Sequence, residues 1–144
     1  MIELPIINKS NNPLPKYQTS QSAGVDLCAF TEGDIIIGPM ERKLVDTGLY
    51  MALPEGYEAM IRPRSGMAFK HGISVINTPG TIDADYRGEI KIALINLSQN
   101  EFTIKNGDRV AQMVVNKYEQ VQFELTDSLD ETDRGSGGYG HTGI

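Results

Sequence analysis

The chain has 144 residues with an ordinary hydrophobic content of 40%, enough for one domain with a sizeable core. Its formal charge of −6 and the lack of a lysine- or arginine-rich block argue against nucleic-acid binding, which needs a basic surface. The chain has no run of about 18 apolar residues and no signal-like first segment, so we expect neither a membrane span nor secretion. The single cysteine, Cys28, cannot form an internal disulfide, which favours a cytoplasmic protein.

Apolar residues alternate with polar ones in short runs, which is typical of half-buried strands, and helical periodicity is almost absent. In chain order, we predict strands at residues 22–29, 34–37, 43–46, 57–62, 73–77, 89–96, 102–105, 109–117 and 121–125. One short helix is expected at residues 65–71. Strands spaced roughly 8–12 residues apart favour an all-β sandwich, jelly roll or barrel.

The last part of the chain becomes acidic after residue 125 and then glycine-rich. We therefore expect a β body over residues 1–125 and a C-terminal arm over residues 126–144. Gly135, Gly137 and Gly140 match the spacing G-x-G-x-x-G of dinucleotide-binding proteins, but too few residues remain for the helix that must follow. Two alternatives stay open on spacing alone: a disordered tail, or an arm whose glycine N–H groups wrap an anion.

Polar residues interrupt the apolar pattern of the body at several points. Asp26 lies in a predicted strand, where a structural carboxylate is the favoured interpretation of that segment alone. Arg64 precedes the predicted helix and Ser65 begins it, so this turn could bind a phosphate or could be an ordinary helix start. Gln112 lies among apolar residues, and its amide is expected to find a structural hydrogen-bond partner.

A further polar segment, residues 77–88, is a turn-rich loop between two predicted strands. It contains Asp83 and Asp85, and a carboxylate at the mouth of a hairpin can accept a proton from water. Tyr86 offers a flat apolar face for a sugar or a base. Taken by itself, the segment is more simply a hairpin with solvated acids.

Taken together, five segments of the chain resemble the five ordered motifs of the trimeric dUTPases, the deoxyuridine triphosphate nucleotidohydrolases. They are Ala-Gly-Val-Asp-Leu (23–27), Pro-Arg-Ser-Gly (63–66), Gly-Thr-Ile-Asp-x-x-Tyr-Arg-Gly (80–88), Gly-Asp-Arg-Val-Ala-Gln (107–112) and Arg-Gly-x-Gly-Gly-x-Gly-x-Thr-Gly (134–143). Five matches in order are far more specific than any one of them. Tyr139 departs from the family, which usually has phenylalanine there, but it keeps the aromatic face.

The resemblance implies an all-β, jelly-roll-like barrel and a homotrimer whose three active sites are shared between subunits. It also implies hydrolysis of dUTP to dUMP and pyrophosphate by water attack on the α-phosphorus. The family's catalytic acid lies three residues before the tyrosine, which selects Asp83 over Asp85. Mg²⁺ is the expected cofactor, because phosphates supply hard oxygen ligands and the chain has few histidines or cysteines.

By the same resemblance, further residues take substrate-binding roles. Those expected to hold the phosphates are Arg64, Ser65, Gly66, Gln112, Arg134 and Thr142. Those expected to contact the nucleoside are Asn77, Gly80, Thr81, Ile82, Tyr86 and Lys91, together with Gly138 and Tyr139 of the arm. Asp26 is expected to hold the waters of Mg²⁺, so that its contact with the metal is indirect.

Two alternative functions are weaker. Deoxycytidine triphosphate deaminases share the fold, but they have a glutamate on the strand after the hairpin, where this chain has Ala93. A methyl group cannot move protons, so this position argues against deamination. A nucleotide-responsive binding module would need an additional partner surface, for which the chain has no spare segment, and it stays open only as a second activity.

Overall fold

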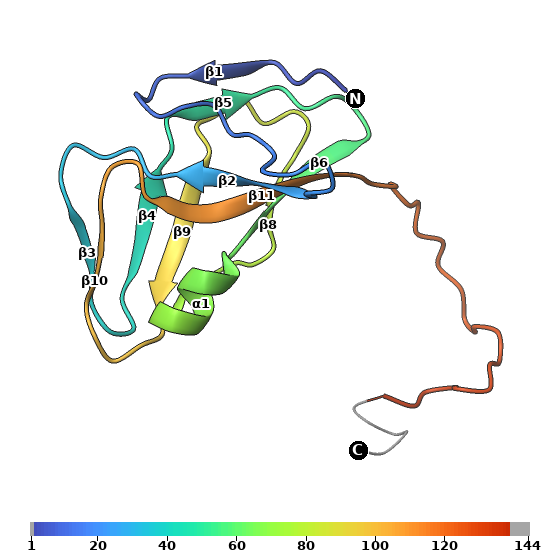
Figure 1. The fold of residues 1–144 in the computed structure, drawn as a ribbon. Coiled ribbons are helices and arrows are strands. Elements are labelled where there is room, and N and C mark those ends of the chain that lie inside the picture. Colours follow the sequence, from blue (N-terminus) through green and yellow to red (C-terminus); the bar gives the residue numbers. More distant parts are fainter. Residues whose placement is uncertain (1, 139–144) are drawn as a thin grey trace.

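Short strands form most of the regular structure of residues 2–138, the part of the chain that this computed structural model describes (Figure 1). The strands are β1 (Ile6–Asn8), β2 (Gly24–Cys28), β3 (Ile35–Ile37), β4 (Arg42–Asp46), β5 (Leu49–Met51), β6 (Tyr57–Arg62), β7 (Ile73–Val75), β8 (Gly80–Ile82), β9 (Lys91–Asn96), β10 (Phe102–Ile104) and β11 (Arg109–Lys117). The helix α1 spans Ser65–His71, which confirms the predicted helix. No helix within the described residues is long and apolar enough to cross a membrane.

The strands pair in antiparallel fashion. The largest sheet has the order β2-β11-β6-β8, and a three-stranded sheet has the order β4-β9-β7. Two smaller pairs, β1 with β5 and β3 with β10, lie at the top and at the left of Figure 1. Because β11 lies between β2 and β6, residue 112 is placed beside both residue 26 and residue 62. The sheet therefore brings together motifs that are far apart in the sequence.

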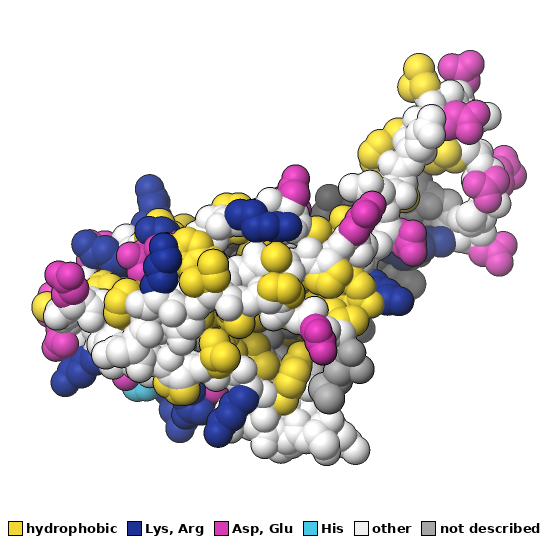
Figure 2. Space-filling model, turned by 90° about the horizontal axis from the view of Figure 1, so that it is seen from above, with side chains coloured by type: hydrophobic (Ala, Val, Ile, Leu, Met, Phe, Trp, Pro, Cys, Tyr) yellow, Lys and Arg dark blue, Asp and Glu magenta, His cyan; other side chains and the backbone are white. Residues whose placement is uncertain are grey.

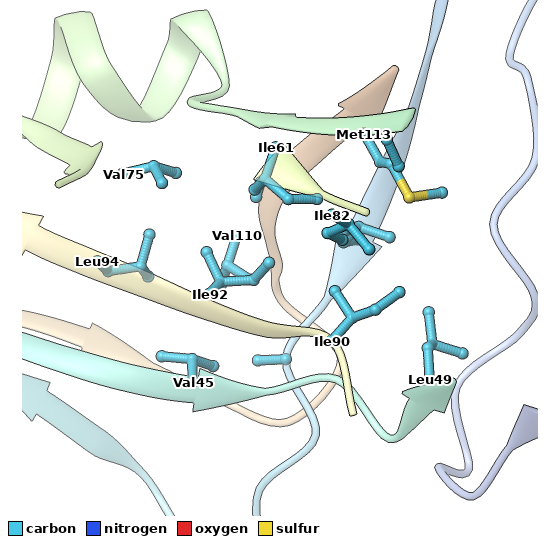
Figure 3. Close-up of a cluster of buried hydrophobic side chains, with 14 of the residues drawn as sticks. Val45, Leu49, Ile61, Val75, Ile82, Ile90, Ile92, Leu94, Val110 and Met113 are labelled. Atoms are coloured by element: carbon cyan, nitrogen blue, oxygen red, sulfur yellow. The ribbon is translucent and has the colours of Figure 1, made fainter. Parts of the chain in front are cut away.

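The core contains side chains from both of the larger sheets (Figure 3). Ile92 and Leu94 of β9 are completely buried, and Ile61 of β6 and Val110 of β11 belong to the same cluster. Residues at alternate positions of β9 are exposed or half-buried. The predicted apolar face of this strand is therefore confirmed, and its packing holds the loop that precedes β9 in place.

The observed fold differs from the predicted elements at several points, and β1 and β5 are strands that the sequence pattern does not predict. Residues 121–125 form neither strand nor helix, so the strand predicted there is wrong for a single chain. A strand needs a neighbour for its backbone N–H and C=O groups, and alternation alone does not supply one. Conversely, residues 80–82 belong to the predicted loop yet form β8, because they pair with β6 at Ala59 and Ile61.

Beyond β11, residues 119–138 leave the body as an extended segment (Figure 1). Val121, Phe123 and Leu125 are 69%, 92% and 101% exposed along this extended segment. Residues 119–133 contain six aspartates or glutamates and no lysine or arginine. Figure 2 shows these acidic side chains gathered where the segment projects from the body. The extended segment therefore combines an unburied apolar edge with a strong negative charge.

Candidate active site

The first group of predicted site residues lies where β2, β11 and the start of α1 meet. Asp26 Oδ1 accepts a hydrogen bond from Arg64 Nε at 2.8 Å, and Asp26 Oδ2 accepts one from Arg109 Nη1 at 3.1 Å. Arg64 Nη1 also donates to the carbonyl of Arg109 at 3.0 Å. A cavity of about 270 Å³ opens beside the two arginines and is also lined by His71 and Asp108. Two guanidinium groups surround the Asp26 carboxylate, so this corner offers N–H donors to an anion, with Asp108 as the second carboxylate beside them.

Gln112 connects two of the predicted phosphate-binding motifs. Its Nε2 donates to the carbonyl of Pro63 at 2.9 Å, which is the structural partner that a half-buried amide needs. This bond ties β11 to the turn before α1, where Arg64 is the N-cap residue and makes no side-chain cap hydrogen bond. The N–H groups of Ser65 and Gly66, in the first turn of the helix, therefore have no capping side chain from Arg64.

The second group of predicted residues lies on the loop between β8 and β9. A cavity of about 190 Å³ is lined there by Thr81, Ile82, Asp83, Tyr86, Glu89, Ile90 and Lys91. Asp83 is exposed, and its carbonyl accepts a hydrogen bond from the Tyr86 N–H at 3.2 Å, which turns the chain back towards β9. The Tyr86 hydroxyl donates to the carbonyl of Glu89 at 2.9 Å. The loop thus presents a carboxylate and an aromatic ring to one small cavity.

Acidic side chains lie around Lys91, where the loop between β8 and β9 ends. Lys91 Nζ lies 2.9 Å from Asp46 Oδ1 and 3.5 Å from Glu89 Oε2. The hydrogen bond to Asp46 raises the pKa of Lys91 above its usual value, so the ammonium stays charged beside the cavity. Asp83 also borders a wider hollow of about 760 Å³, which it shares with Asp85. Both acids of the loop are therefore open to solvent on this side.

The two groups do not meet within one chain. β8 pairs with β6 so that Ile82 lies opposite Ala59, whereas Arg64 follows the far end of β6. An extended chain advances about 3.3 Å per residue, so Asp83 and Arg64 are separated by roughly 20 Å along β6. A carboxylate at that distance cannot act on a phosphate bound to the arginine of its own chain.

The arm is separate from both groups in the part of the chain that the structure describes. Arg134 Nε donates to the carbonyl of Gly137 at 2.9 Å, which is a contact within the arm itself. A Cβ placed on Gly138 would have no heavy atom within 4 Å. Tyr139 and Thr142 lie outside the described residues, so their predicted roles stay predictions.

Sequence reasoning missed two residues that shape these groups. Arg109 belongs to the fourth motif, and its contact with Asp26 follows from the pairing of β11 with β2. Glu89 had no sequence signal, because its carboxylate accepts a hydrogen bond from a turn about forty residues away. The predicted residues Asn77 and Gly80 are close together: a Cβ on Gly80 would lie 3.1 Å from Asn77 Nδ2.

Known proteins similar to this chain agree on one family. A family model described as dUTPase matches residues 10–143. The chain is 60% identical over 142 residues to a deoxyuridine 5'-triphosphate nucleotidohydrolase of Finegoldia magna, and the match covers 99% of each protein. The match therefore spans nearly the whole chain.

Solved structures give the same fold. A mutant dUTPase of Staphylococcus bacteriophage 80alpha with dUpNHpp has a TM-score of 0.90 at 20% identity, with 100% of both chains covered. A mutant dUTPase of phage phi11, whose structure concerns a structural Mg(II) ion, has a TM-score of 0.80 at 20% identity and covers 90% of this chain and 100% of its own. These likenesses confirm the predicted jelly-roll-like fold, and with the family model and the sequence relative they show that the chain belongs to the dUTPase family.

Proposed function

We propose that this protein hydrolyses dUTP to dUMP and pyrophosphate, with water attacking the α-phosphorus. One observation carries the proposal: an arginine-rich corner lies at one end of β6, and a cavity lined by a carboxylate and a tyrosine lies at the other. A triphosphate suits the first and a nucleoside suits the second. In the cell, where a cytoplasmic location is part of the proposal, the reaction would limit uracil entry into DNA and supply dUMP for thymidylate synthesis.

Asp83 is the proposed base that orients and deprotonates the attacking water. Its side chain is exposed at the cavity that Tyr86 also lines, so water can reach it. Asp85 is the rival, but the family spacing selects the acid three residues before the tyrosine. A positioned base contributes roughly 10²–10⁴-fold to a rate, less than the acceleration of most enzymes. Alignment of the substrate and neutralisation of its charge must supply the rest.

The triphosphate is proposed to bind at the arginine-rich corner. Arg64 offers a guanidinium, and Ser65 and Gly66 offer backbone N–H groups at the start of α1. Gln112 uses one N–H of its amide on Pro63, which leaves the second N–H for a phosphate oxygen. The amide is therefore held in one orientation before the substrate arrives.

Mg²⁺ is the proposed cofactor. Residues 2–138 contain no group of three or more His, Cys, Asp or Glu side chains suited to a metal ion, so phosphate oxygens would be its main ligands. Asp26 fits an indirect role, because both of its oxygens already accept hydrogen bonds from arginines and could still accept one from a metal-bound water. When bound, the ion neutralises charge on the triphosphate. The Mg(II) ion of the phi11 protein supports this choice of metal.

A homotrimer with shared sites is proposed because one chain holds its two groups roughly 20 Å apart along β6. In a ring of three copies, the Asp83 loop of one subunit can face the Arg64 corner of the next. The arm of a subunit would then close over a neighbouring site. This closure would bring the predicted arm residues Arg134, Gly138, Tyr139 and Thr142 to the nucleotide and would exclude bulk water.

The surface of the body supports an association of this kind. A mainly apolar groove of about 230 Å³ is lined by Ile2, Leu4, Ile6, Leu14, Pro15, Tyr17, Val25, Met113 and Val115. The extended segment exposes Val121, Phe123 and Leu125 at alternate positions, which is the spacing of one face of a strand. A neighbour's segment in this groove would bury apolar surface on both partners.

Selectivity for deoxyuridine is proposed to come from the loop between β7 and β9. Asn77 and backbone groups would contact the polar edge of uracil, and the tight turn would leave no room for the 5-methyl group of thymine. Tyr86 would pack against the deoxyribose and reject a 2′-hydroxyl. The remaining proposed contacts come from Gly80, Thr81, Ile82 and Lys91.

Deamination of dCTP is the second candidate reaction, and one residue argues against it. Ala93 lies on β9, where the backbone carbonyl accepts a hydrogen bond from the Ile76 N–H at 2.9 Å and the side chain is a methyl group. A methyl group offers no acid or base for attack on the cytosine ring.

Product analysis tests the proposal. The protein is incubated with dUTP, dCTP, dTTP or UTP in the presence of Mg²⁺, and the products are separated. We expect dUMP and pyrophosphate from dUTP, little turnover of the other three, and loss of turnover when EDTA removes the metal. Formation of dUTP from dCTP, or equal hydrolysis of all four nucleotides, would contradict the proposed function.

A further inference from the structure

Tyr86 and Gly88 are packed so closely that a side chain at position 88 would displace the ring. A Cβ built on Gly88 would lie 2.6 Å from Tyr86 Cζ and 2.9 Å from Tyr86 Cε2, and closer still to the hydroxyl oxygen. Gly88 does not have a positive φ, so an alanine there meets no backbone strain. The three heavy atoms nearest to such a Cβ all belong to the Tyr86 side chain, which is 45% exposed.

The backbone that follows Gly88 is held in place by a distant turn. Glu89 Oε1 accepts a hydrogen bond from the Gly48 N–H at 2.8 Å, and the Glu89 side chain is only 15% exposed. On the next residue, the Ile90 N–H donates to the carbonyl of Leu49 at 2.8 Å. The buried hydroxyl of Thr47 donates to the Ile90 carbonyl at 2.6 Å. Three hydrogen bonds thus tie residues 89–90, just before β9, to residues 47–49, where the chain passes from β4 to β5.

The Tyr86 hydroxyl donates to the carbonyl of Glu89, within this anchored stretch, at 2.9 Å. Two features consequently fix the position of the ring. The missing side chain of Gly88 leaves space for the hydroxyl end of the ring, and the Glu89 carbonyl accepts its hydrogen bond. Both features belong to the loop that also presents Asp83 to the cavity. Among the described residues, this backbone carbonyl is the hydrogen-bond partner of the Tyr86 hydroxyl.

We propose that Gly88 and Glu89 are positioning residues that set the selectivity for deoxyribose, because together they hold the Tyr86 ring against the sugar. This inference rests on the proposed function, since it requires a nucleoside in the Tyr86 cavity. Gly88 acts because it has no side chain and so leaves space for the ring. Glu89 acts through its backbone carbonyl, which is held in position because the Glu89 carboxylate accepts a hydrogen bond from the Gly48 N–H. Neither residue is required to touch the substrate.

The first test compares Gly88→Ala with the wild-type protein in steady-state hydrolysis of dUTP and UTP. A fitted pocket rejects an added hydroxyl by roughly 10²-fold, and we expect the ratio of kcat/KM for dUTP over UTP to fall about tenfold. The melting temperature should stay near the wild-type value, because only an exposed ring moves. Gly33→Ala is the matched control, since a Cβ there has nothing within 4 Å, and its ratio should not change.

The second test compares Glu89→Gln with Glu89→Ala and does not depend on how Gly88→Ala folds. Glutamine keeps an oxygen that can accept the Gly48 N–H, so it should retain most of the selectivity, whereas alanine should lose it. If Glu89 had only a structural role, Glu89→Gln and Glu89→Ala would both have a lower melting temperature, and the ratio of kcat/KM for dUTP over UTP would not change. Unchanged ratios in Gly88→Ala and Glu89→Ala would overturn the inference while leaving dUTP hydrolysis intact. A wild-type protein without dUTP hydrolysis would instead overturn the proposed function.

Discussion

Residues 91–96 and residues 121–125 both alternate apolar and polar side chains, yet their surroundings differ completely. The first stretch is β9, which pairs with β4 on one edge and β7 on the other, and its Ile92 and Leu94 are fully buried. The second stretch has no paired neighbour in the described chain, and Phe123 is 92% exposed. The difference teaches that an amphipathic pattern specifies a face, whereas the surface that covers the face can belong to another copy.

Net charge also distinguishes the body of the protein from the extended segment. Residues 1–117 contain 12 basic and 13 acidic residues, a net charge of −1, whereas residues 119–133 contain six acidic residues and no basic one. The acidity of the whole chain therefore lies mainly in the extended segment. Repulsion between like charges keeps such a segment extended, which suits the proposed reach to a neighbouring subunit.

The largest expected effect comes from the body. Asp83→Asn should lower the turnover of dUTP by roughly 10²–10⁴-fold, because an amide cannot take a proton from water. Binding of a non-hydrolysable dUTP analogue should remain close to wild type, as measured by calorimetry. Asp85→Asn is the matched control and should keep most of the activity. The assignment of the base is wrong if Asp83→Asn turns over dUTP at the normal rate.

Removing the residues after Asp133 tests the other region. Without residues 134–144, the glycine-rich part of the arm, we expect turnover to fall by roughly 10²-fold, since misalignment of a bound substrate has effects of this size. The melting temperature should hardly change, because the hydrogen bonds of residues 134–138 in a single chain lie within the arm. A normal rate in the truncated protein would show that the arm has no part in catalysis.

A pair of alanine variants sharpens the comparison between the two alternating stretches. Ile92→Ala should cost about 2–5 kcal/mol in the free energy of unfolding, because it leaves a cavity in the core. Phe123→Ala should leave the folding of one chain almost unchanged but should weaken association. Urea unfolding at several protein concentrations, with analytical ultracentrifugation, separates the two effects. An equal loss of stability at all concentrations in both variants would contradict this contrast.

The smallest expected difference between the body and the extended segment is in the rate at which a cysteine in each is alkylated. Burial, and secondarily the charge of Asp26, raises the pKa of the Cys28 thiol above its usual value. At pH 8.5 the folded protein therefore holds less of the reactive thiolate than an unfolded chain, and alkylation by iodoacetamide should be slower. Ser128→Cys in a Cys28→Ala background should react as fast as a free thiol, because residue 128 is exposed. Equal rates at the two positions would contradict the assigned environment of Cys28.

Much of the body could be predicted from the sequence because its signals are local. Helix α1 and the buried face of β9 follow from short patterns, and the order of the motifs indicated the family. The pairing of residues 80–82 with β6 could not be predicted, since it depends on a neighbour about twenty residues away. The bond between Glu89 and Gly48 is likewise a contact between distant segments, and no local pattern marks it.

The layout of the candidate site shows the same limit. The motifs assign Asp83 and Arg64 to one active site, but the order of motifs along the chain does not give the distance between the two residues. Only the register of β8 on β6 places these residues at opposite ends of one strand. The separation of these two residues is thus a consequence of three-dimensional structure, and it is the basis of the proposed second copy.

Subunit complementation tests the central claim, that the Asp83 loop of one chain acts at the Arg64 corner of another. Asp83→Asn and Arg64→Ala proteins, each inactive alone, are unfolded together, refolded and assayed with dUTP. If sites are shared, the mixture should regain about a quarter of the wild-type activity, because each site then has an even chance of receiving each intact residue from different subunits. A mixture that assembles normally but stays inactive would show that both residues must come from the same chain, and it would contradict the account.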